Sequence, residues 1–278
     1  MDLTIVGNRA GMPADGAASS GYLVRTEQSN ILMDCGPGIA VMLTRYIHAS
    51  QLDAVVISHM HLDHCYDVLP IGKQAMLPVG KTWLVDTDGK GDFHGDDTDR
   101  RIKLLVPRGA RATLDQLAEL FPVRTIPHLN RAFDLAYEVI EYERGQSYEL
   151  ADVTITMVPM VHSSPDCGIR IDGASGSLGF TGDTAYNDNL VTLAKDVDIF
   201  LAEASLQDPD HTRHGHLAGV EVGRVAARAG ARELVLTHFT APQPAWKEAR
   251  RADAAAEFTG PIHIGEPGMT FSTPVKER

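Results

Sequence analysis

The sequence predicts an α/β protein in which β-sheets form the centre and helices cover the outside. Short strand patterns recur from the N-terminus, at residues 3–6, 22–25 and 31–33, each bounded by glycine or polar turns. The last third instead alternates strands with helices, and this order after a β-rich opening favours a layered arrangement. Because no linker divides the chain into two cores, we expect one domain over residues 1–278.

The elements of the first half follow from local patterns. Residues 38–48 have a helical pattern, and the apolar run at residues 54–57 is rich in β-branched residues and too short for a helix, which indicates a buried strand. Residues 86–99 are acidic and glycine-rich without periodicity, so we expect a loop or lid there, with His94 solvated. A helix is expected at residues 111–120.

Strand and helix patterns follow one another through the second half. Strands are expected at residues 137–142, 153–158, 168–171, 177–180, 199–202 and 234–236. Helices are expected at residues 187–195, 217–229 and 245–258. Together with the first half, they predict sheets covered by helices.

The composition narrows the class of protein. The net charge is −12 and no basic stripe is visible, so broad nucleic-acid binding is disfavoured. No apolar run reaches the ~20 residues that span a bilayer, and the N-terminus shows no signal peptide. Cys35, Cys65 and Cys167 form no CxxC pair, which argues against a disulfide framework or a cysteine zinc site, and we expect a cytoplasmic protein.

The most informative segment is His-Met-His-Leu-Asp-His at residues 59–64, directly after a predicted buried strand. In an extended backbone His59, His61 and Asp63 point to one side, while a turn beginning at Asp63 would aim His64 differently. Such a cluster can supply ligands to two adjacent metal ions rather than one. Since a core tolerates four unpaired polar groups poorly, the segment indicates a metal site rather than a polar loop.

Four later polar residues also follow predicted strands. They are His162, Asp183, Glu203 and His238. Each alone could be an ordinary polar residue that closes a strand. Together with the first cluster they form a repeated pattern, in which functional groups gather at one edge of the sheets, where α/β proteins tend to place their chemistry.

With these residues, the chain resembles the metallo-β-lactamase superfamily of dinuclear metallohydrolases. The resemblance rests on the H-x-H-x-D-H motif together with the later histidine, Gly-Asp-Thr and Thr-His segments, and it covers essentially the whole chain. It implies an αββα sandwich of two mixed sheets and two divalent ions, zinc being expected with manganese, iron or cobalt as alternatives. It places His59, His61 and His162 on one ion, Asp63, His64 and His238 on the second, and Asp183 between them.

Within that superfamily the chain is most similar to the ribonuclease Z-like phosphodiesterases, especially a compact bacterial branch that includes cyclic-nucleotide phosphodiesterases. The segments that carry this resemblance are residues 19–24, 33–36, 203–205 and 216–218. Only the short span 163–182 separates His162 from Asp183, whereas the tRNA-processing enzymes insert a long basic arm there. The resemblance therefore implies a small phosphodiester substrate, and a homodimer would fit it.

The implied mechanism assigns roles to three side chains. A hydroxide made available by the two ions would attack phosphorus, with Asp63 as both ligand and candidate orienter of the nucleophile. His216 is the candidate proton donor to the leaving oxygen, and by resemblance Glu203 is its partner. The positive end of the helix expected at residue 217 disfavours imidazolium, but a carboxylate in contact should outweigh it. In the same loop we expect His211 and His214 to be solvated, although either could contact a phosphate, and Arg213 is a candidate for a phosphate contact or for a surface role.

Three other functions stay open from the sequence. The first is a ribonuclease Z-like RNA 3′-processing endonuclease. The second is a hydrolase of the same fold that acts on a lactone, thioester or β-lactam, for which the His216–Glu203 pair is not needed. The third is a non-enzymatic metal or nucleotide sensor, which would bind a ligand tightly without turnover.

Overall fold

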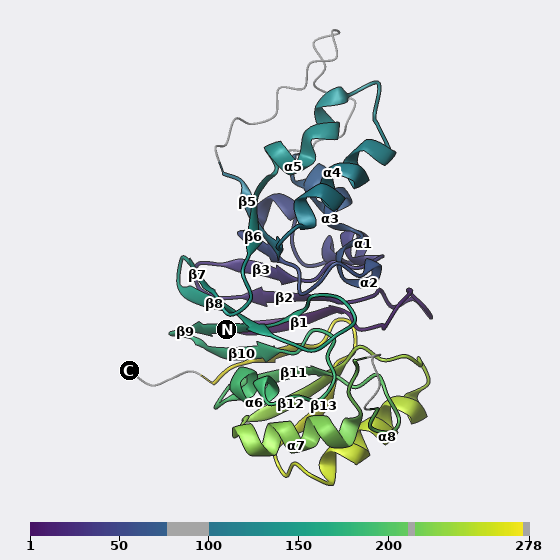
Figure 1. Ribbon diagram of the computed structural model, residues 1–278, viewed down its shortest axis with the longest axis vertical. Helices are drawn as coiled ribbons and strands as arrows, with labels where there is room; N and C mark the ends of the chain where they lie inside the picture. The colour runs from purple at the N-terminus through teal and green to yellow at the C-terminus, as the bar shows by residue number, and fades with distance from the viewer. Residues whose placement is uncertain (77–99, 211–214, 275–278) are drawn as a thin grey trace.

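The computed structural model describes residues 1–76, 100–210 and 215–274. In these ranges two seven-stranded sheets lie at the centre and helices cover both outer sides, as Figure 1 shows. This is the αββα sandwich that the sequence predicts, so the prediction of fold class is confirmed. The expected lid at residues 86–99 with His94, and the loop residues His211, Arg213 and His214, lie outside the described residues.

The first sheet has the strand order β14-β1-β2-β3-β4-β5-β6. Its strands are β1 (Asp2–Gly7), β2 (Gly21–Arg25), β3 (Asn30–Met33), β4 (Ala54–Val56), β5 (Ile102–Pro107), β6 (Tyr137–Tyr142) and β14 (Thr270–Ser272). The pairs from β14 to β3 are antiparallel, and the pairs from β3 to β6 are parallel. The sheet is therefore mixed.

The second sheet has the order β13-β12-β11-β10-β9-β8-β7. Its strands are β7 (Ser147–Leu150), β8 (Val153–Pro159), β9 (Cys167–Gly173), β10 (Gly176–Phe180), β11 (Ile199–Glu203), β12 (Glu233–Thr237) and β13 (Ile262–Ile264). The strands from β10 to β13 are parallel, and those from β7 to β10 are antiparallel. As a result, β8, β10, β11 and β12 all end at the same edge of the sheet.

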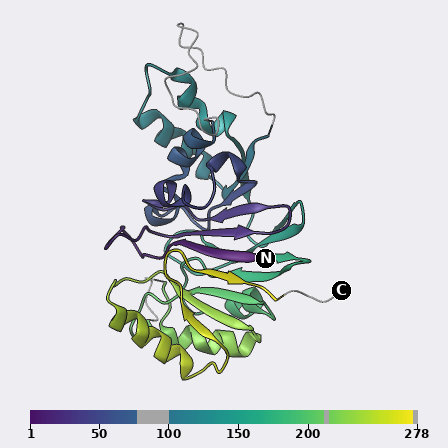
Figure 2. The same ribbon diagram turned by 180° about the vertical axis from the view of Figure 1, so that it is seen from behind.

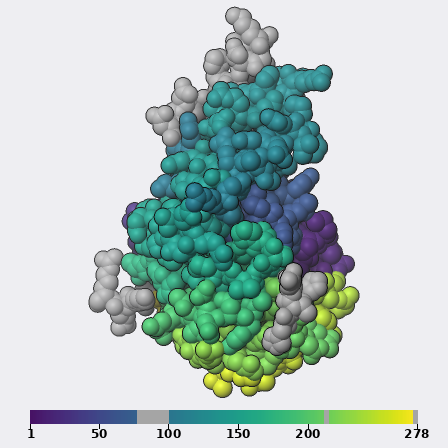
Figure 3. Space-filling model, viewed as in Figure 1, coloured from purple at the N-terminus to yellow at the C-terminus, as the bar shows by residue number. Residues whose placement is uncertain are grey.

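The helices divide between the two outer faces. On the side of the first sheet lie α1 (Ile39–Leu43), α2 (Leu62–Cys65), α3 (Val68–Ala75), α4 (Ala110–Leu120) and α5 (Ala132–Leu135), with the 3-10 helices η1 (Ala49–Gln51) and η2 (Pro127–Arg131). On the other side lie α6 (Asn189–Ala194), α7 (Gly219–Ala229) and α8 (Pro244–Ala255). Figure 2 shows the same division from behind. Figure 3 shows that the upper part of the molecule, where Figure 1 places α4 and α5, forms a projecting lobe.

Three apolar layers hold this arrangement together. Leu3, Ile5, Ile169 and Leu201 belong to a fully buried layer that the two sheets share. A second layer joins the first sheet to its helices, and a third joins the second sheet to α6, α7 and α8. The shared layer fixes the sheets against each other and hence the relative positions of their strand ends. Among the described helices, none has the length and apolar character needed to cross a membrane.

Four helices are shorter than the sequence predicts. α7 begins at Gly219 instead of residue 217, α8 ends at Ala255 instead of residue 258, and α1 and α6 are shortened beside local turns. The helix expected at residues 38–48 ends at Leu43, and a new 3-10 turn begins after His48, whose Nδ1 accepts the N–H of Ser50. The helix expected from residue 187 begins at Asn189, because Asn187 Oδ1 accepts the N–H of Asn189 in a local turn. In both places a side chain competes with the helical backbone for its N–H groups.

Candidate metal centre

The segment at residues 59–64 leaves the first sheet at the carboxyl end of β4. His59 and His61 lie in the extended chain, and α2 begins at Leu62, one residue before the expected turn, so that Asp63 and His64 lie in its first turn. Neighbouring segments hold α2 in place, because the Cys35 N–H donates to the His64 carbonyl at 2.7 Å. A Cβ at Gly36 would lie 1.9 Å from the Asp63 carbonyl oxygen, so only glycine permits this approach.

The polar residues that follow later strands belong to the second sheet and lie beside this segment. His162 follows β8, Asp183 follows β10, Glu203 is the last residue of β11, and His238 follows β12. The structure therefore brings together all the strand-end residues that the sequence singled out. His238 adopts a left-handed backbone (φ 55°), a strained conformation for a residue other than glycine and one that is common at functional sites.

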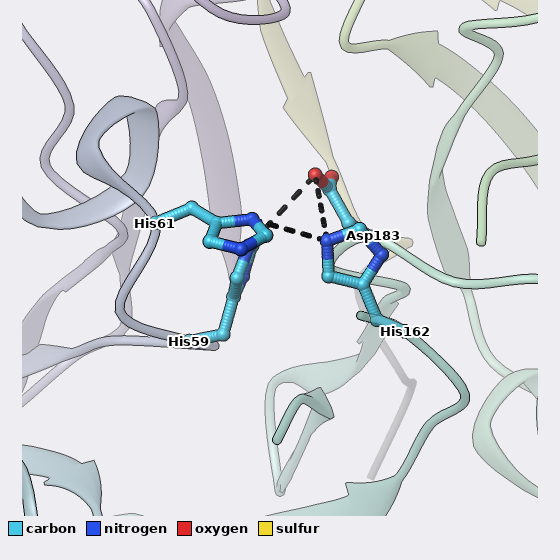
Figure 4. Close-up of side chains that lie close together, drawn as sticks. All are labelled: His59, His61, His162 and Asp183. Carbon is cyan, nitrogen blue, oxygen red and sulfur yellow. Dashed lines mark hydrogen bonds and ion pairs between the residues drawn. The ribbon is translucent and has the colours of Figure 1, made fainter. Parts of the chain in front are cut away.

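The side chains form two clusters that contain the predicted ligands and share Asp183, and a third group of Asp183, Glu203, His216 and His238 overlaps them. The first holds His59, His61, His162 and Asp183, and the second holds Asp63, His64, Asp183 and His238. Within each cluster the candidate ligand atoms lie within 4.8 Å of one another. Figure 4 shows the first cluster, in which His61 Nδ1 lies 3.1 Å from His162 Nε2.

The two carboxylate oxygens of Asp183 face both clusters. Its Oδ2 lies 3.9 Å from His59 Nε2, 4.0 Å from His162 Nε2 and 3.3 Å from His64 Nε2. Its Oδ1 lies 3.4 Å from His238 Nε2. A carboxylate placed in this way can act as a bridging ligand between two cations.

Buried atoms without partners show that this donor set fits metal ions. His59 and His64 are fully buried and Asp183 is nearly so. In the described part of the chain, His59 Nε2, His64 Nε2 and Asp183 Oδ1 make no hydrogen bond. Such atoms are costly in a protein interior unless something binds them, and imidazole nitrogens and carboxylate oxygens are common zinc ligands.

The other nitrogen of each of four candidate ligand histidines is held by a further group. The distances are 2.7 Å from His64 Nδ1 to Asp34 Oδ2, 3.1 Å from His59 Nδ1 to Asp166 Oδ2, 2.9 Å from His162 Nδ1 to the Gly215 carbonyl, and 2.9 Å from His238 Nδ1 to Ser205 Oγ. Such contacts fix the tautomer and turn the remaining nitrogen toward the metal position.

Sequence reasoning did not assign these supporting residues. Asp34 could have been found, because it follows β3 at a strand end as the candidate ligands do. Ser205 lies in the segment 203–205, which carries the family resemblance but assigns no role to the serine. Asp166 carries no such signal, since it lies in the loop before β9 and reaches the site only through the fold. Cys65 joins neither cluster of candidate ligands.

The charged groups in the two clusters shift one another's pKa values. Burial lowers the pKa of His64, but the negative charges of Asp183 and Asp34 raise it by more, so the net pKa lies well above the usual range. Burial raises the pKa of Asp183, but His238 and His64 lower it by more, and the net pKa lies well below the usual range. Burial and the charge of His64 lower the pKa of His59. The Asp183 carboxylate is therefore ionised and suited to a cation.

The predicted pair of His216 and Glu203 lies beside the second cluster. His216 Nδ1 is 3.0 Å from Oε2 and 3.2 Å from Oε1 of Glu203, which is fully buried. Burial lowers the pKa of His216, but the charge and hydrogen bond of Glu203 raise it by more, to about 9. The carboxylate in contact therefore outweighs the effect of burial on the pKa of His216.

A cavity of about 430 Å³ opens over both clusters. Its lining includes Ala10, Gly11, His61, Asp63, Ser163 and His216. The loop after β1 enters this lining and also supports a candidate ligand, because the Gly11 N–H donates to Asp63 Oδ2 at 2.7 Å. The cavity gives a small molecule access to both clusters and to His216.

Known proteins share this sequence and architecture. A family model described as "Beta-lactamase superfamily domain" matches residues 29–239. The chain is 31% identical over 272 residues to "Probable metallo-hydrolase YhfI" of Bacillus subtilis (strain 168), covering 98% of this chain and 99% of that protein. It is 28% identical over 282 residues to a ribonuclease Z of Mycobacterium bovis (strain BCG / Pasteur 1173P2), covering 95% of each.

Solved structures agree with these matches. The crystal structure of YhfI from Bacillus subtilis has a TM-score of 0.77 at 26% identity and covers 97% of this chain and 98% of its own. The crystal structure of a diphosphatase from the PhnP family has a TM-score of 0.67 at 18% identity, covers 99% and 97%, and shows a common fold alone. With the His/Asp clusters of a metal-dependent hydrolase at its strand ends, the chain belongs to the metallo-β-lactamase superfamily.

Proposed function

We propose that the protein is a dinuclear metal-dependent phosphodiesterase that acts on a small phosphodiester such as a cyclic nucleotide. The observation that carries the proposal is the contact of His216 with the buried Glu203 beside the clusters, at 3.0 Å. An alkoxide leaving group needs a proton, and this pair supplies a histidine that holds one near neutral pH.

In this proposal seven side chains hold two ions. His59, His61 and His162 would hold the first, Asp63, His64 and His238 would hold the second, and Asp183 belongs to both groups. Nitrogen and oxygen donors of this kind favour zinc, with manganese, iron or cobalt as alternatives. Two such ions make water nucleophilic near pH 7 and neutralise negative charge on a phosphoryl group.

The protein's own groups orient the reaction. Asp63 Oδ2 is held by the Gly11 N–H at 2.7 Å, so this carboxylate keeps a fixed direction toward the cavity and can orient the attacking water. His216 Nδ1–H donates to Glu203, which leaves Nε2 to give its proton to the leaving oxygen. Bound dications would repel the imidazolium and lower the pKa of His216, whereas Glu203 counteracts this effect.

The chain between His162 and Asp183 supports a small substrate. Residues 163–182 contain β9 and β10, which pair as an antiparallel hairpin with Gly173 opposite Gly176, so this span carries no projecting arm that could hold tRNA. The net charge of −12 also opposes binding of a long polyanion.

A second candidate is an RNA 3′-processing endonuclease. It is favoured by the 28% identity to a ribonuclease Z over 95% of both chains. Cleavage of tRNA precursors at the 3′ side, with an affinity that falls steeply with salt, would select this candidate over the first.

The test is hydrolysis by the zinc-loaded and manganese-loaded protein of bis(p-nitrophenyl) phosphate and of a panel of cyclic and linear phosphodiesters. Absence of turnover on every member would refute the phosphodiesterase. Hydrolysis of lactones or thioesters alone would indicate acyl chemistry, and tight nucleotide binding without turnover would indicate a sensor.

A pair of variants tests the proton donor. His216→Ala should lower the rate while the protein retains two ions. His263→Ala is the matched control, because His263 Nε2 lies 3.4 Å from Glu233 Oε2 in a similar pair on β13 and β12, outside the clusters. Loss of metal from His216→Ala, or an equal loss of rate in His263→Ala, would contradict the assignment.

A further inference from the structure

A buried serine lies between the metal centre and the candidate proton donor. Ser205 is 2% exposed, and its Oγ is 2.5 Å from Glu203 Oε2 and 2.9 Å from His238 Nδ1. We infer that Ser205 is a positioning residue that presents His238 to the second ion and joins this ligand to the Glu203–His216 pair. The inference rests on the proposed function for the roles of His238 and His216.

The number of protons on Ser205, Glu203 and His238 determines which group donates in each of these hydrogen bonds. A serine hydroxyl has one proton, and a carboxylate accepts but does not donate. The shortest contact of Ser205 Oγ is with the Glu203 carboxylate, at 2.5 Å, whereas the His238 carbonyl lies at 2.9 Å. Because charge-assisted bonds are the stronger ones, the hydroxyl donates to Glu203. Its lone pairs then accept the Nδ1–H of His238.

This arrangement selects the tautomer of His238. With its proton on Nδ1, the ring has a free lone pair on Nε2. That nitrogen lies 3.4 Å from both Asp63 Oδ2 and Asp183 Oδ1, at the centre of the second cluster. Only an unprotonated nitrogen can bind a metal ion, so the serine hydroxyl prepares His238 as a ligand.

No other described group can take over this contact without a rearrangement. Ser205 Oγ is the hydrogen-bond partner of His238 Nδ1 among the described residues, and the carboxylate oxygen Glu203 Oε2 lies 3.9 Å away, beyond hydrogen-bonding distance. The backbone around Ser205 is also held, because Thr240 Oγ1 donates to the Ser205 carbonyl at 2.8 Å and the Ala204 N–H donates to the Thr237 carbonyl at 3.0 Å. Removal of the hydroxyl therefore leaves a buried N–H unpaired or forces the ring to move.

A comparable arrangement on the other side of the site provides an internal comparison. Asp34 Oδ2 binds His64 Nδ1 directly at 2.7 Å and accepts from Ser58 Oγ at 3.0 Å, and Ser58 Oγ lies 3.1 Å from His59 Nδ1. In both places a buried carboxylate holds one histidine directly and a second through a serine. His59 Nδ1, however, also has Asp166 at 3.1 Å, so Ser58 is backed by a second acceptor and Ser205 is not.

The test measures zinc binding rather than turnover. Chelator competition gives the affinity of each ion for the wild type and for Ser205→Ala, and the variant should bind one of its two ions about 10–100-fold more weakly, as is typical for loss of a group that orients a ligand. Ser205→Thr keeps the hydroxyl and should restore the affinity. Ser58→Ala should weaken binding less than Ser205→Ala, because Asp166 still holds His59.

A matched control separates positioning from general stability. Ser177 Oγ donates to the buried Asp198 at 3.1 Å at the start of β10, outside the clusters, so Ser177→Ala removes a similar hydrogen bond. It should leave both zinc affinities unchanged. Wild-type affinities in Ser205→Ala, or an equal loss in Ser177→Ala, would overturn the inference.

A second variant covers the case in which Ser205→Ala does not fold. Ser205→Cys has a similar volume with a weak donor and acceptor, and it should show the same loss of one zinc affinity. If the wild type binds two ions but hydrolyses no phosphodiester, the proposed function fails, whereas the positioning role is still decided by the affinities.

Discussion

Removal of the metal ions should destabilise the protein by several kcal/mol. Three buried atoms at the centre lack hydrogen bonds within the described chain: His59 Nε2, His64 Nε2 and Asp183 Oδ1. A buried polar group without a partner costs about 1–3 kcal/mol, so the metal-free site carries about 3–9 kcal/mol that bound ions relieve. Independently, a ligand present at a thousand times its Kd stabilises the folded state by about 4 kcal/mol, or about 8 kcal/mol for two sites. The cost of the unpaired atoms and the stabilisation by two bound ions are therefore of similar size.

The assay is thermal unfolding in excess chelator and in excess zinc. For a chain of this size, each kcal/mol shifts Tm by about 2–4 °C, so a difference of about 8 kcal/mol predicts a shift of about 15–30 °C. Asp183→Ala removes the shared carboxylate and should abolish most of that shift. Asp198→Ala removes another buried carboxylate, which is hydrogen-bonded to Ser177 outside the clusters, and should lower Tm in both conditions while the shift is retained.

Equal Tm values of the wild type in chelator and in zinc would refute this reasoning. So would a full shift in Asp183→Ala, because the shared carboxylate would then contribute nothing to binding. A shift that saturates at one ion per chain would refute the dinuclear arrangement while leaving a single metal site.

Three further predictions follow from particular contacts. Glu203 holds the pKa of His216 at about 9, so Glu203→Gln should lower that pKa and move the alkaline limb of the pH–rate profile to lower pH; an unmoved limb would contradict the role of the pair. A Cβ at Gly36 would lie 1.9 Å from the Asp63 carbonyl oxygen, so Gly36→Ala should cost about 1–3 kcal/mol in urea unfolding and weaken zinc binding in a chelator assay; wild-type zinc affinity would show that α2 moves freely. Phe200 is fully buried between β11 and its helices, so Phe200→Ala should cost about 3–5 kcal/mol in the same unfolding assay, with zinc stoichiometry unchanged in the folded protein; loss of zinc there would mean that the outer layer also shapes the site.

Local patterns predict most of the strands because their apolar residues are contiguous. The expected strand at residues 137–142 matches β6 in both bounds, and the strands expected at 199–202 and 234–236 lie within β11 and β12. β11 and β12 are buried on both faces between layers, which selects short β-branched and apolar runs.

Other elements depend on partners that a local pattern does not contain. β7 has a burial pattern that is mostly exposed, and it is a strand because it pairs antiparallel with β8. β14 is a short strand near the end of the chain and exists as an edge partner of β1, which lies at the chain's beginning. Edge strands of this kind are set by pairing rather than by their own hydrophobicity.

The candidate ligands could be predicted from the sequence, whereas two of their supporting residues, Ser205 and Asp166, could not. His59, Asp183 and His238 carry donor groups at strand ends, a pattern that is visible along the chain. Ser205 and Asp166 act only because the fold brings them to His238 and His59, which are distant from them in the sequence. A serine or an aspartate in a loop has many ordinary uses, so nothing local distinguishes these two.

The location of the candidate site has a consequence for folding. His59, His61, Asp63 and His64 come from the edge of the first sheet, whereas His162, Asp183 and His238 come from the edge of the second. Each cluster therefore contains groups from both sheets, and neither is complete until the layer shared by the sheets has formed. Ions bound there would connect the two halves of the sandwich at one edge. Their contribution to stability should therefore act on the packing of the sheets as a whole, and zinc should slow global unfolding rather than only ordering the loops around the site.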